Sequence, residues 1–300
     1  MTLLLPLIFL LLGVGLRYFS LLPDRTPRLL NAFVINVSLP AITLLYIHQL
    51  QLTADIIIPA AVAWAIFIIS IPLCLVAGKL LSWDKKTIGA VILCCGLGNT
   101  SFVGFPVIAS LYGQEALKIA VLVDQPGGFL ILSTLGLATA AYFAGQKVRP
   151  SVVLKKMLLF PAFPIFIISI ALAFLQISLP GEINWFLGIL GKTITPFALT
   201  SIGMQLSVSR KDLKPGIIAA GLSYKLLVAP ALIFLAFMLY GNPETLTAKV
   251  CIMESAMGPM VSAAIVAIQY NLRPKLVSQL AGIGIPLSFL TLAVWYFVIG

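Results

Sequence analysis

Long runs of apolar residues alternate with short polar connections along this chain of 300 residues. An α-helix needs about 20 apolar residues to cross the roughly 30 Å hydrocarbon core of a bilayer. Ten runs of about this length predict ten transmembrane helices, over residues 3–20, 29–48, 56–81, 88–112, 116–143, 152–175, 184–207, 215–240, 246–270 and 276–299. We therefore expect an all-α polytopic membrane protein.

The fourth and ninth runs are interrupted by glycine, proline and polar residues. The fourth contains Gly-Leu-Gly-Asn-Thr-Ser at 96–101, ahead of Pro106, and the ninth contains Glu-Ser-Ala-Met-Gly-Pro at 254–259. Proline removes a backbone donor and frees a carbonyl one turn earlier, and glycine weakens a helix. Unwound backbone is tolerated inside a bilayer only where it is buried or lines a watery cavity. The pattern predicts two helices, broken with the help of Pro106 and Pro259, that cross near the midplane and form a substrate site.

The interruption falls in the fourth helix of each half of the chain. Because five helices precede the second half, that half is inserted upside down relative to the first, which is an inverted-topology repeat. Prolines recur in matching helices, as Pro40 with Pro196, Pro72 with Pro230, and Pro106 with Pro259. For Pro72 and Pro230, helix kinks that serve packing are an alternative explanation that needs no repeat. We expect a 5+5 inverted repeat with halves 1–146 and 147–300.

Composition supports the membrane assignment. Hydrophobic residues make up 61% of the chain and charged residues only 9%, with a mean hydropathy of +1.12, whereas soluble domains carry roughly 25% charged residues. Met1 and Thr2 provide no positive charge and no small-residue cleavage site follows Arg17, so we expect the first run to be an uncleaved helix.

Lysine and arginine are concentrated in alternate connections. The odd connections hold Arg17, Arg25, Arg28, Lys79, Lys85, Lys86, Lys147, Arg149, Lys155, Lys156, Arg210, Lys211, Lys214, Arg273 and Lys275, and the even ones only Lys118 and Lys249. Positively charged short loops stay in the cytoplasm, so both termini are expected outside. The net charge of +10 is spread over five connections, which favours anionic lipid headgroups as partners and argues against nucleic acid.

Four ionisable residues fall inside the predicted helices: Asp124, Lys192, Lys225 and Glu254. Each is a functional-site hypothesis, because buried charge in a bilayer is costly. Asp124 and Glu254 enter from the outer side to similar depths and could share one ion site, with Ser255 beside it. The carboxylates, freed carbonyls and the Asn99 amide are hard oxygen ligands suited to Na⁺, and a buried carboxyl could instead carry a proton. The sequence leaves both alternatives open.

Half-helices that meet inside a membrane direct their positive N-terminal ends at anionic substrates. The predicted substrate-binding residues are Asn99, Thr100, Ser101, Gly258 and Lys225. Lys225 could equally be a structural partner of an acid or of freed carbonyls, and Lys192 is interpreted as a packing or interface residue. The simpler alternative for the fourth run is a kink in which Ser and Thr bond backwards to carbonyls.

Several other chemistries are disfavoured. Gly191-Lys192-Thr193 lacks the first glycine of a phosphate loop, since Phe186 stands there, which argues against an ATP-driven pump. The lone His48 has no second His or Cys at zinc-ligand spacing. We expect no metal centre beyond Na⁺ at Glu254 and Asn99, and no cofactor beyond the coupling ion.

Three stretches resemble a known family. Asn-Thr-Ser-Phe-Val-Gly-Phe-Pro at 99–106, followed by Leu-Tyr-Gly at 111–113, resembles the crossover motif of the auxin efflux carrier family, which includes the plant PIN-type carriers. Residues 269–274 and 31–40 are also similar to that family. The resemblance covers nearly the whole chain.

This resemblance implies a ten-helix transporter whose fold is shared with bile-acid/sodium symporters. Helices 1, 2, 6 and 7 would form a scaffold domain, and helices 3–5 and 8–10 a transport domain. Asn99 matches the substrate-binding Asn and Pro106 the helix-breaking proline, while Glu254 lies where sodium-coupled relatives keep a cation-ligating Glu. The second crossover, Met-Gly-Pro-Met at 257–260, lacks the Asn of PIN-type carriers, which disfavours auxin as the substrate. Bacterial members of the family resemble carriers of malate or malonate, implying a bacterial inner (plasma) membrane.

We therefore expect a secondary active transporter of a small organic anion, working by alternating access with Na⁺ or H⁺ coupling, and not an enzyme. The alternatives are a carrier of auxin-like aromatic carboxylates, a passive anion channel, or an intramembrane enzyme using Ser101 or Ser255 near Glu254. The sequence leaves open whether the protein forms a homodimer.

Overall fold

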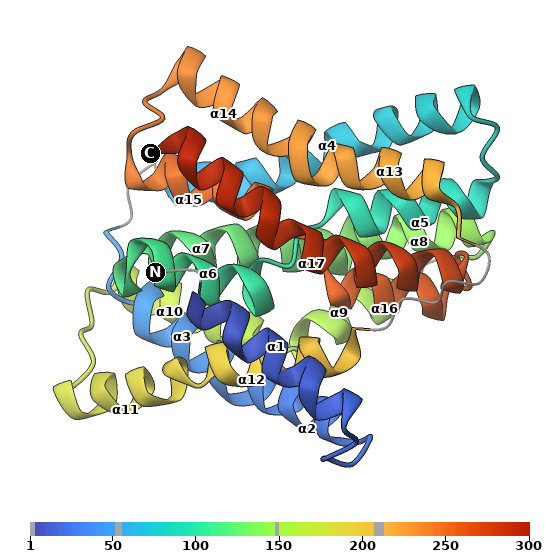
Figure 1. Cartoon of the computed structure of the whole chain (residues 1–300). Coiled ribbons are helices and arrows are strands. Elements are labelled where there is room, and N and C mark those ends of the chain that lie inside the picture. Colours follow the sequence, from blue (N-terminus) through green and yellow to red (C-terminus); the bar gives the residue numbers. More distant parts are fainter. Residues whose placement is uncertain (1–3, 52–55, 148–149, 207–212) are drawn as a thin grey trace.

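The computed structural model describes residues 4–51, 56–147, 150–206 and 213–300, and these are helical with no β-strand (Figure 1). Within them, six helical stretches are long and apolar enough to cross a membrane. They are Thr26–Ile47, Ile57–Leu80, Gln114–Ala144, Gly181–Gln205, Pro215–Tyr240 and Pro274–Ile299.

Two of these stretches are single α-helices, α4 (Ile57–Leu80) and α17 (Pro274–Ile299). The other four are built from shorter helices in line: α2 (Thr26–Phe33) with α3 (Leu39–Ile47), α7 (Leu117–Val123) with α8 (Leu137–Ala144), α11 (Gly181–Lys192) with α12 (Ile194–Gln205), and α13 (Pro215–Ser223) with α14 (Ala229–Tyr240). A 3₁₀ turn, Gln114–Ala116, precedes α7.

The remaining predicted spans are occupied by shorter helices. They are α1 (Leu4–Tyr18), α5 (Lys85–Gly96) with α6 (Phe105–Tyr112), α9 (Pro150–Leu159) with α10 (Ala162–Phe174), and α15 (Leu246–Ser255) with α16 (Val261–Gln269). The split between α9 and α10 differs from the continuous helix predicted over 152–175, and its physical reason is Pro161, which has no N–H to continue the ladder. Of the predicted cytoplasmic basic residues, Arg149, Arg210 and Lys211 lie outside the described residues.

Wide π-helical turns interrupt several helices next to prolines. The turns Val34–Ser38 and Tyr224–Val228 end two residues before Pro40 and Pro230, and a third, Asp124–Phe129, contains Pro126. A fourth, Leu132–Gly136, follows it. Such turns relieve the clash between a proline ring and the preceding turn of helix.

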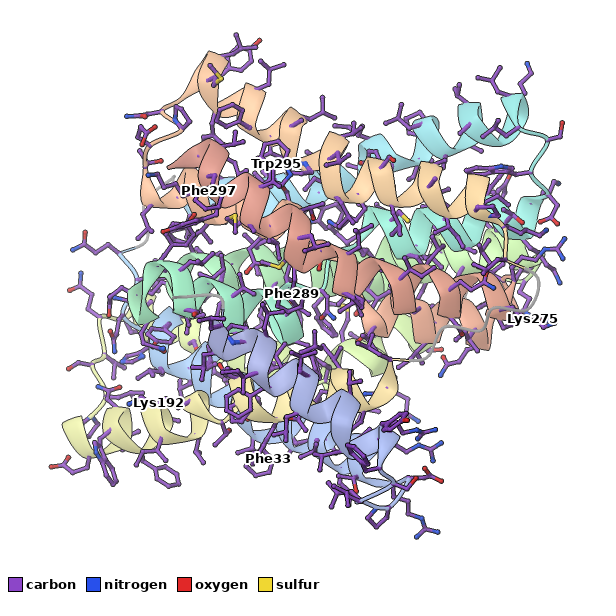
Figure 2. All side chains as sticks on the ribbon, in the orientation of Figure 1. Phe33, Lys192, Lys275, Phe289, Trp295 and Phe297 are labelled. Atoms are coloured by element: carbon purple, nitrogen blue, oxygen red, sulfur yellow. The ribbon has the colours of Figure 1, made fainter. Side chains whose placement is uncertain are left out.

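The carbonyl freed by one of these prolines is satisfied from another helix. Pro230 cannot donate to Leu226, and the indole of Trp295 on α17 donates to the Leu226 oxygen instead, at 3.0 Å (Figure 2). The proline distortion thereby fixes α17 against the helix that holds Lys225.

The helices form two groups. In Figure 1, α1, α2, α3 and α10–α12 lie together along the lower side, and α4, α5, α13–α15 and α17 lie above, with α6 and α7 between them and α16 beneath α17. Within the lower group, α1 and α12 touch backbone to backbone, since a Cβ on Gly203 would lie 2.9 Å from the Cα of Gly13. The start of α1 and the end of α17 lie at the same end of the bundle.

Candidate functional site

The two interrupted segments are bonded to each other through their backbones. Between α5 and the π-helical turn Thr100–Gly104, the Asn99 amide donates to the Gly258 carbonyl at 2.8 Å, and the Met260 amide donates to the Leu97 carbonyl at 3.1 Å. Gly98 and Pro259 thereby form an isolated antiparallel bridge. Segments about half the chain apart in sequence are held side by side, and each leaves helical geometry where glycine and proline are concentrated.

The Asn99 side chain offers a donor at this junction. It is 2% exposed, and its Nδ2 has no hydrogen-bond partner among the described residues. A buried amide without a partner costs roughly 1–3 kcal/mol, so a ligand that accepts from Nδ2 would recover that energy. The first amides of a helix have no intrahelical partner, and the turn beginning at Thr100 and α16, beginning at Val261, both start two residues after the bridged pair Gly98 and Pro259.

Lys225 caps the negative end of the second interrupted helix. Its side chain is 1% exposed and rises from the π-helical turn Tyr224–Val228. The ammonium donates to the carbonyl oxygen of Ser255, the last residue of α15, at 2.8 Å. A cation at a helix C-terminus is stabilised by the helix dipole. Two roles were predicted for Lys225. The structure contains the contact expected for the structural role, a hydrogen bond from the ammonium to a freed carbonyl.

Asp124 is held by donors from the first interrupted segment. Its Oδ1 accepts from Thr100 Oγ1 at 2.5 Å and from Ser101 Oγ at 2.8 Å, and its Oδ2 accepts from Gln125 Nε2 at 2.8 Å. The Thr100 and Ser101 hydroxyls therefore donate to Asp124 and not backwards to carbonyls of their own helix. Sequence reasoning did not identify Gln125 as a partner, because side chains at i and i+1 do not face each other on a regular α-helix.

Glu254 lies against the turn that follows Asn99. Its side chain is 1% exposed, and neither carboxylate oxygen has a hydrogen-bond partner among the described residues. A Cβ on Gly104 would lie 2.6 Å from Glu254 Oε1, so this glycine, which sequence reasoning did not single out as a site residue, makes room for the carboxylate. Ser255, the predicted ion ligand beside it, turns its hydroxyl to the Ile252 carbonyl at 2.6 Å.

A buried ionised carboxylate without a partner is far too costly to persist. Glu254 therefore requires a bound proton or a neighbouring cation. The nearby ammonium of Lys225 is already directed at the Ser255 carbonyl. The Glu254 carboxylate therefore has no hydrogen-bonding donor among the described residues.

The space between the two segments is small. A cavity of about 20 Å³ lies among residues that include Gly98, Thr100, Lys225, Glu254 and Ser255. About 10–15 Å³ is enough for one water molecule, so the cavity fits an ion or a water and not an organic anion. A substrate would have to enter by moving the helices apart.

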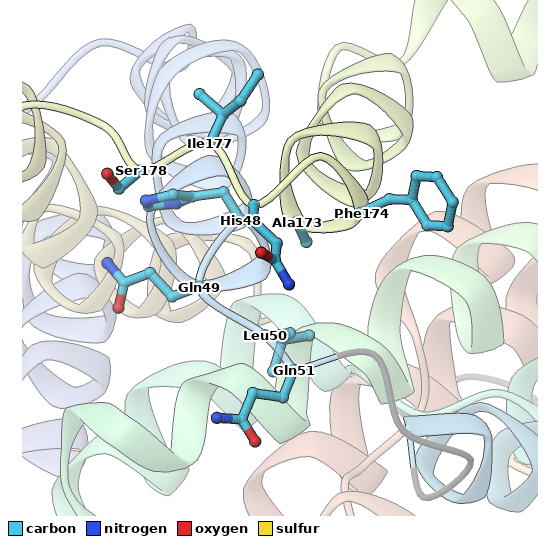
Figure 3. Close-up of a pocket in the computed structure, with 9 residues that line it drawn as sticks. His48, Gln49, Leu50, Gln51, Ala173, Phe174, Ile177 and Ser178 are labelled. Carbon is cyan, nitrogen blue, oxygen red and sulfur yellow. The ribbon is translucent and has the colours of Figure 1, made fainter.

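Other predicted residues lie elsewhere. Lys192 is exposed at the end of α11, away from the interrupted segments (Figure 2). His48 lines a separate open pocket of about 580 Å³ where the chain leaves α3 and α10 (Figure 3). Among the described residues, no group of three or more His, Cys, Asp or Glu side chains is placed to hold a metal ion.

The chain matches a family along almost its full length. Residues 1–296 match the family described as membrane transport protein, which is the auxin efflux carrier family. The chain belongs to this family. The resemblance seen in the crossover motif is therefore confirmed, and membership indicates a multi-pass membrane transporter in preference to an enzyme.

Two relatives cover nearly all of the chain. An uncharacterized transporter of Methanocaldococcus jannaschii is 29% identical over 306 residues, covering 99% of this chain and 97% of its own length. An uncharacterized transporter of Methanothermobacter thermautotrophicus is 26% identical over 308 residues, with the same two coverages of 99% and 97%. Both relatives are archaeal, and the bacterial inner membrane stays a prediction for this chain.

Proposed function

We propose that this protein is a secondary active carrier of a small organic anion, and that the anion binds between the two interrupted segments. The observation that carries the proposal is the buried Nδ2 of Asn99, which has no hydrogen-bond partner in the described part of the chain, beside the bonded backbones of residues 97–99 and 258–260. An amide donor together with helix N-termini suits a carboxylate. Mono- or dicarboxylates of the size of malate and malonate are the proposed substrates.

The proposed architecture is ten membrane crossings in two inverted five-helix halves, 1–146 and 147–300. The break after α5 and the break after α15 occupy the fourth position of each half, which supports this division. The start of α1 and the end of α17 lie at one end of the bundle, as an even number of crossings requires (Figure 1). The basic connections suggest that this end faces outward.

Transport would occur by movement of one helix group against the other. The scaffold would comprise α1–α3 and α10–α12, whose backbone contact at Gly13 and Gly203 favours a rigid unit. The remaining helices, with both interruptions, would move as the transport domain. Such a movement exposes the junction to each side in turn and lets in an anion that the 20 Å³ cavity cannot hold.

Coupling would arise at Glu254, with Asp124 nearby. Binding of H⁺ or Na⁺ neutralises the buried carboxyl, which removes the repulsion between it and an entering anion. Coupling to H⁺ predicts that uptake depends on the pH gradient. Coupling to Na⁺ predicts that it depends on the sodium gradient.

Uptake by proteoliposomes tests this function. Vesicles containing the purified protein are given labelled malate or malonate under an inward Na⁺ gradient, an inward H⁺ gradient, or neither, and indole-3-acetate is added as a competitor. A carrier accumulates anion above the outside concentration, and an ionophore that dissipates the driving gradient abolishes accumulation. Equilibration without accumulation under every gradient would indicate a channel or a uniporter and contradict the proposal of secondary active transport.

A further inference from the structure

Lys225 is held in place by contacts of the residues on either side of it. The hydroxyl of Tyr224 donates to the Ile66 carbonyl on α4 at 2.5 Å. The Leu226 carbonyl accepts from the indole of Trp295 on α17 at 3.0 Å (Figure 2). The π-helical turn that carries Lys225 is thereby tied to two other helices, which limits where its buried ammonium can reach.

This ammonium lies at the break of the second interrupted helix. In a continuous helix the Ser255 carbonyl would accept from the amide of residue 259, but Pro259 has no N–H. The Lys225 ammonium donates to this freed carbonyl at 2.8 Å. A Cβ on Gly98 would lie 3.0 Å from Lys225 Nζ and 3.3 Å from the backbone oxygen of Glu254. The ammonium therefore lies between the two interrupted segments.

The oxygens that could ligate a metal cation at this junction are largely engaged. The carbonyls of Leu97 and Gly258 accept from backbone amides across the bridge, and Asp124 accepts from three side chains. The Glu254 carboxylate accepts no hydrogen bond from the described residues. A hard cation needs several oxygen ligands at once, so this carboxylate by itself is too little for Na⁺.

The ammonium also opposes a second cation by its charge and by its volume. The cavity that Lys225 shares with Glu254 and Ser255 measures about 20 Å³, which is room for about one water molecule. Two positive charges this close repel each other strongly in a protein interior. The negative end of α15, in contrast, stabilises the ammonium where it is. A Na⁺ ion would have to displace it.

We propose that the Lys225 ammonium is a tethered cation that takes the place of Na⁺ at the junction of the two interrupted segments. The wild type then binds no Na⁺ there. Removal of the ammonium creates a Na⁺ site, whose ligands are the Glu254 carboxylate and the freed Ser255 carbonyl. This inference rests on the proposed function for the role of the junction in transport, and it decides against Na⁺ as the coupling ion.

The test compares thermal unfolding of the purified, detergent-solubilised protein in sodium chloride and in choline chloride at equal concentration, without substrate. Lys225→Met removes the ammonium and keeps most of the stem, and Lys225→Gln leaves an amide that can still donate to the Ser255 carbonyl. The double variant Lys225→Met/Glu254→Gln also removes the charged ligand of the new site. Lys192→Met is the control, since Lys192 is exposed at the end of α11.

For the wild type and Lys192→Met we expect equal unfolding temperatures in the two salts. For the two single Lys225 variants we expect a rise of a few degrees in sodium chloride, because a ligand that binds only the folded state stabilises it. The double variant should lose this rise. A rise in the wild type, its absence from both single variants, or its persistence in the double variant would overturn the proposal.

A second measurement does not depend on the stability of any Lys225 variant. Equilibrium binding of radioactive Na⁺ is measured on the wild type and on Glu254→Gln. We expect the same binding to both proteins. Saturable binding to the wild type that Glu254→Gln abolishes would show that Na⁺ binds with the ammonium in place, and the proposal would be wrong.

Failure of this inference and failure of the proposed function give different results. If the wild type accumulates malate or malonate only under a Na⁺ gradient, the carrier function stands and the tethered cation is wrong. If no gradient drives accumulation, the proposed function is wrong, while the salt dependence of unfolding still decides whether Lys225 replaces Na⁺.

Discussion

Glu254 and Gly104 lie in such close contact that no side chain fits between them. A Cβ on Gly104 would lie 2.6 Å from Oε1 and 2.8 Å from Cδ of Glu254, well inside van der Waals contact. The glycine belongs to the first interrupted helix and the glutamate to the second. The proposed coupling carboxyl of one half therefore packs on the backbone of the other half.

This contact predicts that Gly104→Ala destabilises the protein and impairs transport. Adding a methyl group to a packed interior typically costs about 1–3 kcal/mol, and here it displaces the Glu254 carboxyl. The unfolding temperature and proteoliposome uptake both report the effect. Gly15→Ala is the matched control, because no atom lies within 4 Å of its added Cβ. Equal behaviour of the two variants would refute the packing argument.

Lys225→Met should lower stability and reduce transport. The methionine keeps the apolar stem but leaves the Ser255 carbonyl without its donor, and a buried unsatisfied acceptor costs roughly 1–3 kcal/mol. Lys192→Met is the control, since Lys192 is exposed at the end of α11. Unfolding of both variants is followed by intrinsic fluorescence. A Lys225 variant as stable as the wild type would show that the hydrogen bond contributes nothing.

Glu254→Gln should leave the protein folded but uncouple or abolish transport. The amide has nearly the shape of the carboxyl but carries no charge for H⁺ or Na⁺ to neutralise. Uptake with and without the driving gradient measures coupling. Glu244→Gln, which changes an exposed glutamate paired with Lys249, is the control. Full gradient-driven uptake by the Glu254 variant would assign coupling to another residue.

The sequence was sufficient to locate both interruptions. Helix-weakening glycines at 96 and 98 and proline at 259, next to polar residues, are local signals, and the helices do end at Gly96 and Ser255. The fold class and the family could also be predicted, because apolar length and a contiguous motif are properties of the chain itself.

Contacts between helices could not be predicted in the same way. Nothing near Lys225 in the sequence indicates Ser255, and nothing near Asp124 indicates Thr100 and Ser101, since these pairs meet only after folding. The π-helical turn Tyr224–Val228 was also missed, because Pro230 predicts a distortion without specifying its width.

The number of membrane crossings could be predicted from the sequence only in part. Hydropathy predicts ten runs, whereas six described helical stretches meet the length and apolarity of a span. Three of the four other runs fall where helices are broken, at α5 with α6, α9 with α10 and α15 with α16. The fourth is α1, which the structure describes as a helix of 15 residues. A broken helix gives the same hydropathy as a continuous one.

The central claim, that Asn99 holds the anion between the two interrupted segments, is tested most directly by substrate affinity in one variant. Uptake of labelled malonate and malate is measured as a function of concentration for the wild type, Asn99→Ala and Asn36→Ala. Asn36→Ala is the control, because it removes an exposed side chain that bonds only to a carbonyl of its own helix. We predict that Asn99→Ala weakens apparent affinity about tenfold or more, the loss of one hydrogen bond to a charged group, while Asn36→Ala matches the wild type. Wild-type affinity and rate in a folded Asn99→Ala protein would contradict the account.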